Sequence, residues 1–230
     1  MKIIVSGKGK MGKALLETAA EMESKDKNKS FELVTLIGRE QLSTSLPEGD
    51  IILDFSSPVM ALAMAEIAIE RKIPFITGTT GFNKDELERL KNIGTKIPVL
   101  VSYNFSLGIA LFARILKEIP SILGPNWDIE LSETHHKDKL DAPSGTAFRL
   151  LESLDPDGTL RNNGALGVHS LRGGTVIGEH TVSFFGPHET FSITHRSEDR
   201  KVFAQGALMA CEKLITKGPG FYTLEELMFS

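Results

Sequence analysis

The chain has 230 residues, enough for one large domain or two of modest size with a sizeable core. Hydrophobic residues at 41% and charged residues at 24% are the proportions of an ordinary globular protein, not of a disordered one. A formal net charge of −4 argues against general binding to nucleic acid or to an anionic membrane, although a local basic cluster can still attract a small anion.

Cysteine content and hydropathy indicate the compartment. Cys211 is the single cysteine, which excludes an intrachain disulfide and a cysteine-based zinc site and favours a reducing environment. The chain opens with only a short apolar run, without the core of a signal peptide. The apolar stretch 59–69 is interrupted by Glu66 and is too short to cross a bilayer. We therefore expect a cytoplasmic protein with no membrane partner.

The first part of the chain alternates β-branched runs with amphipathic helical patterns, which is typical of a parallel sheet covered by helices. Ser57 and Pro58 predict the start of one helix, and Asn83 with Glu86 predicts a capping box on the next. Strands are expected at 3–6, 31–37, 51–55, 75–77 and 98–102, and helices at 11–23, 58–72 and 83–93. This order predicts an α/β domain of the Rossmann type, a doubly wound parallel sheet.

The pattern changes after Asn104. A helix is expected at 107–119, a strand at 127–132, and a short helix from about Gly145 to the turn at 155–158. Residues 168–172, 175–185 and 190–196 alternate apolar and polar side chains between glycine-rich turns, which predicts an antiparallel sheet. A second, α+β domain with a mixed or antiparallel sheet is therefore expected, and the amphipathic helix at 200–217 could dock back on the first domain.

A glycine-rich loop follows the first predicted strand and opens the first helix. It fits G-x-G-x-x-G and comprises Gly7, Lys8, Gly9, Lys10, Met11 and Gly12. In this place glycines allow a tight turn and let a pyrophosphate approach the N–H groups of a helix N-terminus; a glycine turn without a ligand is the alternative. After the second strand, Arg39 stands where NAD-binding loops carry an acidic residue, which favours the 2′-phosphate of NADPH, whereas Glu40 would suit NADH.

Polar residues also follow the fourth and fifth predicted strands. The carboxyl ends of parallel strands are where such sheets bind ligands, so these small and amide side chains could lie against a nicotinamide; ordinary strand-to-helix turns are the alternative. The candidate cofactor-binding residues are Gly78, Thr79, Thr80, Ser102, Tyr103, Asn104 and Phe105.

The stretch ETHHKDKLDAPSGTA, residues 133–147, has three interpretations. Lysines are usually exposed, so a solvated basic loop is the simplest. A metal site is the second, but His135 and His136 are adjacent, lack the i, i+4 spacing of a helical metal pair, and have no H-E-x-x-H around them, so we predict none.

The third interpretation is an anion site. Pro143, Ser144, Gly145 and Thr146 have the pattern of a helix N-terminus, whose N–H groups and hydroxyls bind carboxylates. Lys139 adds a positive charge, and a histidine exchanges protons near neutral pH. Asp141 could orient Lys139 or cap the helix. Together these residues would suit a small dicarboxylate.

These motifs resemble the 4-hydroxy-tetrahydrodipicolinate reductase (dihydrodipicolinate reductase) family. The resemblance rests on Glu133–His136, Lys139 and Asp141–Ala147, which is similar to the family's E-x-H-H-x-x-K-x-D-A-P-S-G-T-A signature. Supporting matches follow in the family's order along nearly the whole chain: Asp54–Ser56, Gly78–Phe82, Asn104–Ser106, Arg172–Thr175, Gly178–His180, Ile193–His195 and Phe203–Ala204.

The resemblance implies NAD(P)H-dependent reduction of a cyclic dicarboxylate to tetrahydrodipicolinate in diaminopimelate and lysine biosynthesis. It implies that His135 and Lys139 transfer protons and that His136, Gly145 and Thr146 bind substrate; Ser144 is a further candidate because of its place at the predicted helix N-terminus. It also implies a dinucleotide domain of residues 1–105 and 201–230, a substrate and tetramerisation domain of residues 106–200, hinges near Phe105 and Arg200, and a homotetramer.

The chain departs from the family pattern in the glycine loop, which is one residue shorter and has Lys10 where arginine is frequent, and in compact segments at 40–50 and 152–164. These departures bear on cofactor preference more than on the reaction. Two other functions are weighed against this one. A dehydrogenase of another amino-acid pathway finds no support in the histidine pair, and a dinucleotide-sensing regulator would need a partner-binding module that the sequence does not reveal.

Overall fold

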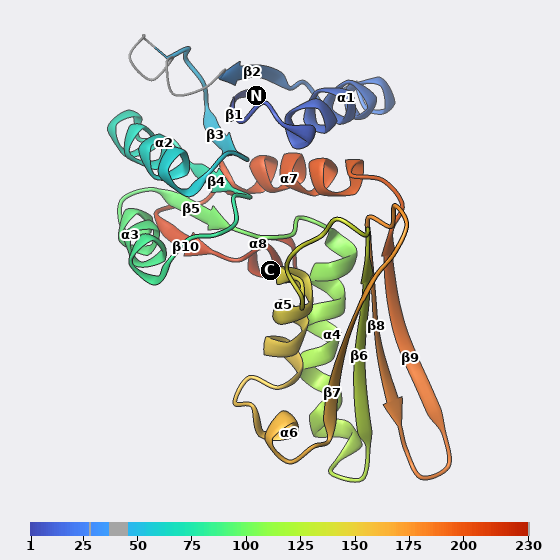
Figure 1. Ribbon diagram of the computed structural model, residues 1–230. Coiled ribbons are helices and arrows are strands. Elements are labelled where there is room, and N and C mark those ends of the chain that lie inside the picture. The colour runs from blue at the N-terminus through green and yellow to red at the C-terminus, as the bar shows by residue number, and fades with distance from the viewer. Residues whose placement is uncertain (28, 37–45, 230) are drawn as a thin grey trace. The chain divides into compact units, whose positions relative to one another are not determined.

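The structure is a computed structural model that describes residues 1–27, 29–36 and 46–229 (Figure 1). The chain divides into two compact units. One comprises Met1–Ser106 together with Lys201–Ser230, and the other comprises Leu107–Arg200. Each unit has its own sheet and its own core.

The first unit contains a six-stranded sheet in the order β10-β5-β4-β3-β1-β2, in which every pairing is parallel. The predicted Rossmann-type fold is therefore confirmed. The strands are β1 (Lys2–Ser6), β2 (Glu32–Leu36), β3 (Ile51–Asp54), β4 (Phe75–Thr77), β5 (Pro98–Val101) and β10 (Gly220–Tyr222). β10 was not predicted, because its three residues form no β-branched run and it gains its partners by pairing along β5.

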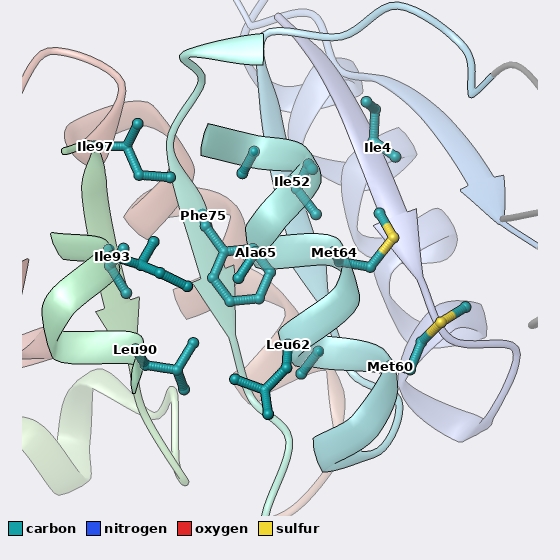
Figure 2. Packing of buried hydrophobic residues seen from close by; sticks show 13 residues of the cluster. Ile4, Ile52, Met60, Leu62, Met64, Ala65, Phe75, Leu90, Ile93 and Ile97 are labelled. Carbon is teal, nitrogen blue, oxygen red and sulfur yellow. The ribbon is translucent and has the colours of Figure 1, made fainter. Parts of the chain in front are cut away.

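Both faces of this sheet are buried. Helices α2 (Pro58–Arg71) and α3 (Lys84–Gly94) enclose one core, in which Met64 and Leu62 of α2 and Leu90 of α3 surround Phe75 of β4 (Figure 2). Ile3 and Ile51, which alternate with the strand residues of that core, are equally buried and face the other way. Helices α1 (Lys10–Lys25) and α7 (Lys201–Leu214) pack against each other, and α7 contacts β3 and β5; α8 (Leu224–Phe229) packs on α7.

The helix starts in this unit follow the sequence signals closely. The side chain of Asn83 accepts a hydrogen bond from the Glu86 N–H at 2.9 Å, and Glu86 accepts one from the Asn83 N–H at 2.8 Å, so the predicted capping box is confirmed. Ser57 is the N-cap of α2 and Pro58 its first helical residue, although the Ser57 side chain makes no capping hydrogen bond.

The second unit is a mixed four-stranded sheet, in the order β7-β6-β8-β9, with helices on one face (Figure 1). Its elements are α4 (Leu107–Leu123), β6 (Asp128–His135), α5 (Gly145–Leu154), α6 (Thr159–Asn162), β7 (Leu166–Arg172), β8 (Gly178–Phe185) and β9 (Thr190–Ser197). Phe112 and Leu116 of α4 and Leu150 of α5 pack on Leu131 and Val182 of the sheet. No helix among the described residues is long and apolar enough to cross a bilayer.

Three expectations for this unit were wrong in detail. β7 runs parallel to β6, because α5 and α6 lie between them and form the crossover that a parallel pair requires. α4 continues through Pro120 to Leu123, since the Leu123 side chain still packs against the core beyond the expected end at Ile119. β6 continues to His135, so this histidine lies on a strand and not in a loop.

Candidate active site

The glycine loop has the geometry that a dinucleotide needs. Gly7 has a φ of 118°, and a Cβ added there would lie 2.3 Å from the carbonyl oxygen of Phe55. A Cβ on Gly12 would lie 2.7 Å from the carbonyl oxygen of Gly7, so α1 can pack this closely only without a side chain. Gly9 is the N-cap of α1, is exposed, and has no protein atom within 4 Å of the point that a Cβ would occupy. The open side of the loop therefore faces away from the protein and leaves room for a pyrophosphate.

The carboxyl ends of β1, β3, β4 and β5 lie along one edge of the sheet, and a buried carboxylate organises this edge. Asp54 accepts hydrogen bonds from the hydroxyls of Ser56, of Thr77 at 2.9 Å and of Thr79 at 2.6 Å. The Thr79 hydroxyl also accepts a hydrogen bond from the Ser56 N–H at 2.9 Å. The Thr79 side chain is thus buried and bound within the protein, while its contact with a nicotinamide stays a prediction.

Most of the other predicted cofactor-binding residues at this edge also pack or form hydrogen bonds within the protein. A Cβ on Gly78 would lie 2.1 Å from the Phe55 ring, and Phe105 is buried edge-on against that ring, with centroids 5.5 Å apart. Ser102 donates a hydrogen bond to the carbonyl of Asn104 at 2.7 Å. The Phe105 side chain is therefore part of the core, and the contact of this residue with a cofactor stays a prediction. Thr80 and Tyr103 are exposed and can meet a ligand.

The residues predicted to select the cofactor, Arg39 and Glu40, lie outside the described residues, as do all of 37–45. NADPH preference therefore stays a prediction. The other residues predicted to bind the cofactor, which follow β1, β4 and β5, lie at one edge of one sheet.

In the second unit, β6 places Glu133 and His135 two residues apart and therefore on the same face of the sheet, where both are buried. Glu133 Oε1 accepts hydrogen bonds from the Ser144 N–H at 3.1 Å, the Ser170 hydroxyl at 2.7 Å and Arg172 Nη2 at 2.8 Å. Burial alone would raise the pKa of Glu133, but these three donors outweigh it and lower the pKa to about 2. Glu133 is therefore a carboxylate throughout the working pH range.

His135 is only 7% exposed and has two close neighbours. Its Nδ1 lies 2.8 Å from Glu133 Oε2, and its ring meets that of His180 edge-on, with centroids 5.1 Å apart. Burial lowers the pKa of His135, and the negative charge of Glu133 opposes this effect. His136 is half-buried and lies one residue beyond the end of β6, so the structure separates two histidines that the sequence left interchangeable.

Lys139 is held at the start of the loop that follows. Its Nζ lies 2.7 and 2.8 Å from the two carboxylate oxygens of Asp141, and the Asp141 carbonyl accepts a hydrogen bond from Arg172 at 2.6 Å. Burial would raise the pKa of Asp141, but the hydrogen bond and charge of Lys139 outweigh it and lower that pKa. Of the two roles considered for Asp141, the structure supports orientation of Lys139, because Ser144 is the helix cap.

α5 begins where the sequence predicts, and its first turn is open on one side. Ser144 Oγ accepts a hydrogen bond from the Ala147 N–H at 3.1 Å and lies 3.2 Å from His180 Nε2. Ser144 is buried and its hydroxyl binds within the protein, while its role as a substrate ligand stays a prediction. Gly145 is exposed, with nothing within 4 Å of a Cβ position, and Thr146 is half-buried beside it. An anion can approach this helix N-terminus at Gly145.

Comparison with known proteins places this arrangement in a family. Two family models match, described as dihydrodipicolinate reductase N-terminus over residues 1–105 and C-terminus over residues 108–228. The 4-hydroxy-tetrahydrodipicolinate reductase of Exiguobacterium sibiricum is 39% identical, over 99% of this chain and 96% of its own. The chain belongs to the dihydrodipicolinate reductase family. The enzyme of the same name from Alkaliphilus oremlandii is 38% identical over 78% of this chain and 80% of its own.

A solved structure shares the fold. Dihydrodipicolinate reductase from Paenisporosarcina sp. TG-14, determined with dipicolinate bound, matches with a TM-score of 0.77 and 22% identity over 99% of both chains. The family resemblance drawn from the 133–147 stretch is thus confirmed, and so is the oxidoreductase class that it implied.

Sequence reasoning assigned no role to four residues of this site. Glu133 and His180 contact His135, and Ser170 and Arg172 bind Glu133. All but Glu133 come from β7 and β8. Glu133 alone carried a usable signal, because it lies two residues before His135 and directly after the strand predicted at 127–132.

Among the described residues, three side chains of this site have the spacing of metal ligands. One ligand atom each from Glu133, His135 and His180 lie within 4.8 Å of one another, which the scattered histidine spacing did not anticipate. However, the guanidinium of Arg172 already binds the Glu133 carboxylate, and Lys139 lies close enough to lower the pKa of His135. A dication would have to displace or tolerate both positive charges, so the donor set fits a divalent metal poorly.

Proposed function

We propose that this chain catalyses the NAD(P)H-dependent reduction of 4-hydroxy-tetrahydrodipicolinate to tetrahydrodipicolinate in diaminopimelate and lysine biosynthesis. The observation that carries the proposal is one short stretch, residues 135–146, which holds a buried histidine beside a carboxylate, a lysine paired with Asp141, and an open helix N-terminus. In a member of this family, these groups supply protons and bind carboxylates in the same unit.

A small dicarboxylate fits this stretch. Gly145 and Thr146 at the start of α5 offer the positive end of a helix, and Lys139 and His136 add side-chain donors. The solved relative from Paenisporosarcina contains dipicolinate, a planar dicarboxylate. We assign substrate binding to His136, Ser144, Gly145 and Thr146, and the Ser144 hydroxyl also caps α5.

The reaction requires one hydride, one proton and the loss of water. NAD(P)H supplies the hydride when it is bound at the glycine loop of the first unit. His135 or Lys139 supplies the proton: His135 lies at the end of β6 beside Glu133, and Asp141 fixes the ammonium group of Lys139. The proton donors are worth roughly 10²- to 10⁴-fold in rate, the usual range of general acid catalysis.

The decisive experiment follows NADPH oxidation with substrate made by the preceding synthase. We expect His135→Ala and Lys139→Ala to lose most of kcat while they bind NADPH like the wild type. His169→Ala is the matched control, because His169 is an exposed histidine of the same unit that pairs with Glu130. Normal turnover in both test variants would refute the assignment, and a protein that does not oxidise NADPH with this substrate would refute the function.

The same assay decides the cofactor, and the assembly is measured separately. We propose NADPH over NADH, on the basis of Arg39, and expect Arg39→Ala to raise the KM for NADPH and leave that for NADH unchanged. An equal effect on both cofactors would contradict this.

We further propose a cytoplasmic homotetramer, by resemblance to the family. Light scattering on the purified protein tests the oligomeric state.

A further inference from the structure

The two oxygens of Glu133 have separate tasks. Oε1 accepts all three hydrogen bonds from Ser144, Ser170 and Arg172, which come from the start of α5 and from β7. Oε2 makes none of these contacts and lies 2.8 Å from Nδ1 of His135 and 3.8 Å from Nε2 of His180. The carboxylate is fully buried, so its orientation is set by the protein and not by solvent.

We propose that Glu133 is a positioning residue for the reduction, which holds the His135 ring through Nδ1 and leaves Nε2 as the nitrogen that exchanges a proton with substrate. This inference rests on the proposed role of His135. It adds what the 133–147 motif does not state, namely which ring nitrogen reacts and which group decides it.

The buried polar atoms support this tautomer. Glu133 Oε2 and His135 Nδ1 are both shielded from solvent, and neither has an aligned hydrogen-bond partner among the described residues. They lie 2.8 Å apart, so a small rotation of the ring satisfies both, provided that Nδ1 carries the proton. A neutral ring with its proton on Nε2 would instead point the Nδ1 lone pair at a carboxylate, and both atoms would stay unsatisfied.

The surroundings of Nε2 differ from those of Nδ1. Gly178 on β8 is its neighbour, and a Cβ there would lie 3.0 Å from Nε2. Glycine at this position keeps a side chain away from the nitrogen that is proposed to react.

Charges around His135 come from every segment that packs on it. Glu133 on β6 and Asp141 in the loop favour its protonated form, whereas Lys139 in the loop and Arg172 on β7 oppose it. His180 on β8 is neutral near pH 7, because burial lowers its pKa to about 4, with smaller contributions from neighbouring charges. Glu133 is thus the nearest negative charge, and its removal makes His135 harder to protonate.

Glu133→Gln tests the proposal with almost no change in shape. The glutamine oxygen can still accept hydrogen bonds from Ser170 and Arg172, but its NH₂ group would face His135 and donate to Nδ1. The neutral ring must then carry its proton on Nε2. Side-chain ¹⁵N shifts of His135, assigned by their loss in His135→Gln, report the tautomer directly and do not depend on turnover.

We expect Nδ1–H in the wild type and Nε2–H in Glu133→Gln. We also expect kcat to fall roughly 100-fold while KM changes little, and the limb of the pH–kcat profile set by His135 to move to lower pH. Glu130→Gln is the matched control: it makes the same change on the same strand beside another histidine, His169 at 2.6 Å, but on the exposed surface. It should leave the His135 shifts and kcat unchanged.

The outcomes are separable. His135 shifts that are the same in Glu133→Gln and wild type overturn the proposal, and so does an altered tautomer with normal kcat. Tight Zn²⁺ binding that Glu133→Gln abolishes would also overturn it, because Glu133, His135 and His180 would then be ligands. If Glu133→Gln does not fold, the wild-type spectrum decides, since a neutral Nε2–H ring contradicts the proposal. A wild type inactive on this substrate refutes the proposed function but leaves the tautomer test intact.

Discussion

Gly9→Ala and Gly12→Ala separate ligand binding from folding within the glycine loop. At Gly12 a methyl group would lie 2.7 Å from a backbone oxygen that cannot move alone, so we expect overpacking to destabilise the first unit by about 1–3 kcal/mol. At Gly9 the methyl meets no protein atom within 4 Å. Because alanine is a poorer N-cap but reduces unfolded-state entropy, stability should change by less than about 1 kcal/mol.

The Gly9 methyl would occupy the space that we assign to the pyrophosphate. If it displaces one backbone hydrogen bond to a charged phosphate, about 1.5–3 kcal/mol of binding is lost, which is roughly a 10- to 100-fold rise in Kd. Calorimetric titration with NADPH measures this, and urea unfolding followed by circular dichroism measures stability.

Gly218→Ala is the matched control for Gly9→Ala, because Gly218 is also exposed in the first unit with nothing within 4 Å of a Cβ. It should change neither stability nor affinity appreciably. Wild-type NADPH affinity in Gly9→Ala would refute the assignment of the loop, whatever the effect of Gly12→Ala on folding.

Three further predictions concern the buried polar groups. Thr79→Val should destabilise the protein by about 1–3 kcal/mol, measured by urea unfolding, because it removes a donor to Asp54; a change in NADPH affinity without a loss of stability would contradict the structural role. Glu133 has its pKa lowered from 4.5 to about 2, so its stabilisation is complete above pH 4.5 and lost as the pH falls toward 2. The test compares His135→Gln with the double variant His135→Gln, Glu133→Gln, whose free energies of unfolding are measured by Trp127 fluorescence. The difference between the two free energies should fall by about 2 kcal/mol from pH 7 to pH 3, and a constant difference would contradict the lowered pKa. Dialysis against a chelator should leave NADPH oxidation unchanged, because Arg172 and Lys139 disfavour a dication near His135, and recovery of lost activity by Zn²⁺ would contradict this.

The parallel sheet of the first unit could be predicted from sequence because its strands are short β-branched runs that end in glycine or polar residues. β4 was predicted to the residue, at Phe75–Thr77. β10 could not be predicted in the same way, because Gly220–Tyr222 has no strand pattern of its own and forms only along β5. The parallel partner of β6 was missed for a related reason, since alternation along a strand reveals which face is buried but not the direction of its neighbour.

In the candidate site, too, local features could be predicted from the sequence and contacts between distant residues could not. His135, Lys139 and the start of α5 lie on one stretch, and local rules for helix caps and charges were enough to group them. Ser144 and Thr79 are among the predicted ligand-binding residues, and their hydroxyls contact His180 and Asp54, which lie 36 and 25 residues away in the chain. A sequence pattern shows that a hydroxyl is available and cannot show which distant group engages it first.

The contact between the His135 and His180 rings determines which of the two histidines can be protonated. Two imidazoles with ring centroids 5.1 Å apart repel each other when both are protonated, so one must stay neutral if the other is to carry charge. Deeper burial assigns the neutral role to His180, whose pKa is lowered to about 4, and Glu133 lies nearer to His135 at 2.8 Å than to His180 at 3.8 Å. The carboxylate therefore favours protonation of His135, the histidine at the end of β6 that the proposed reaction uses, while its neighbour adds no competing charge.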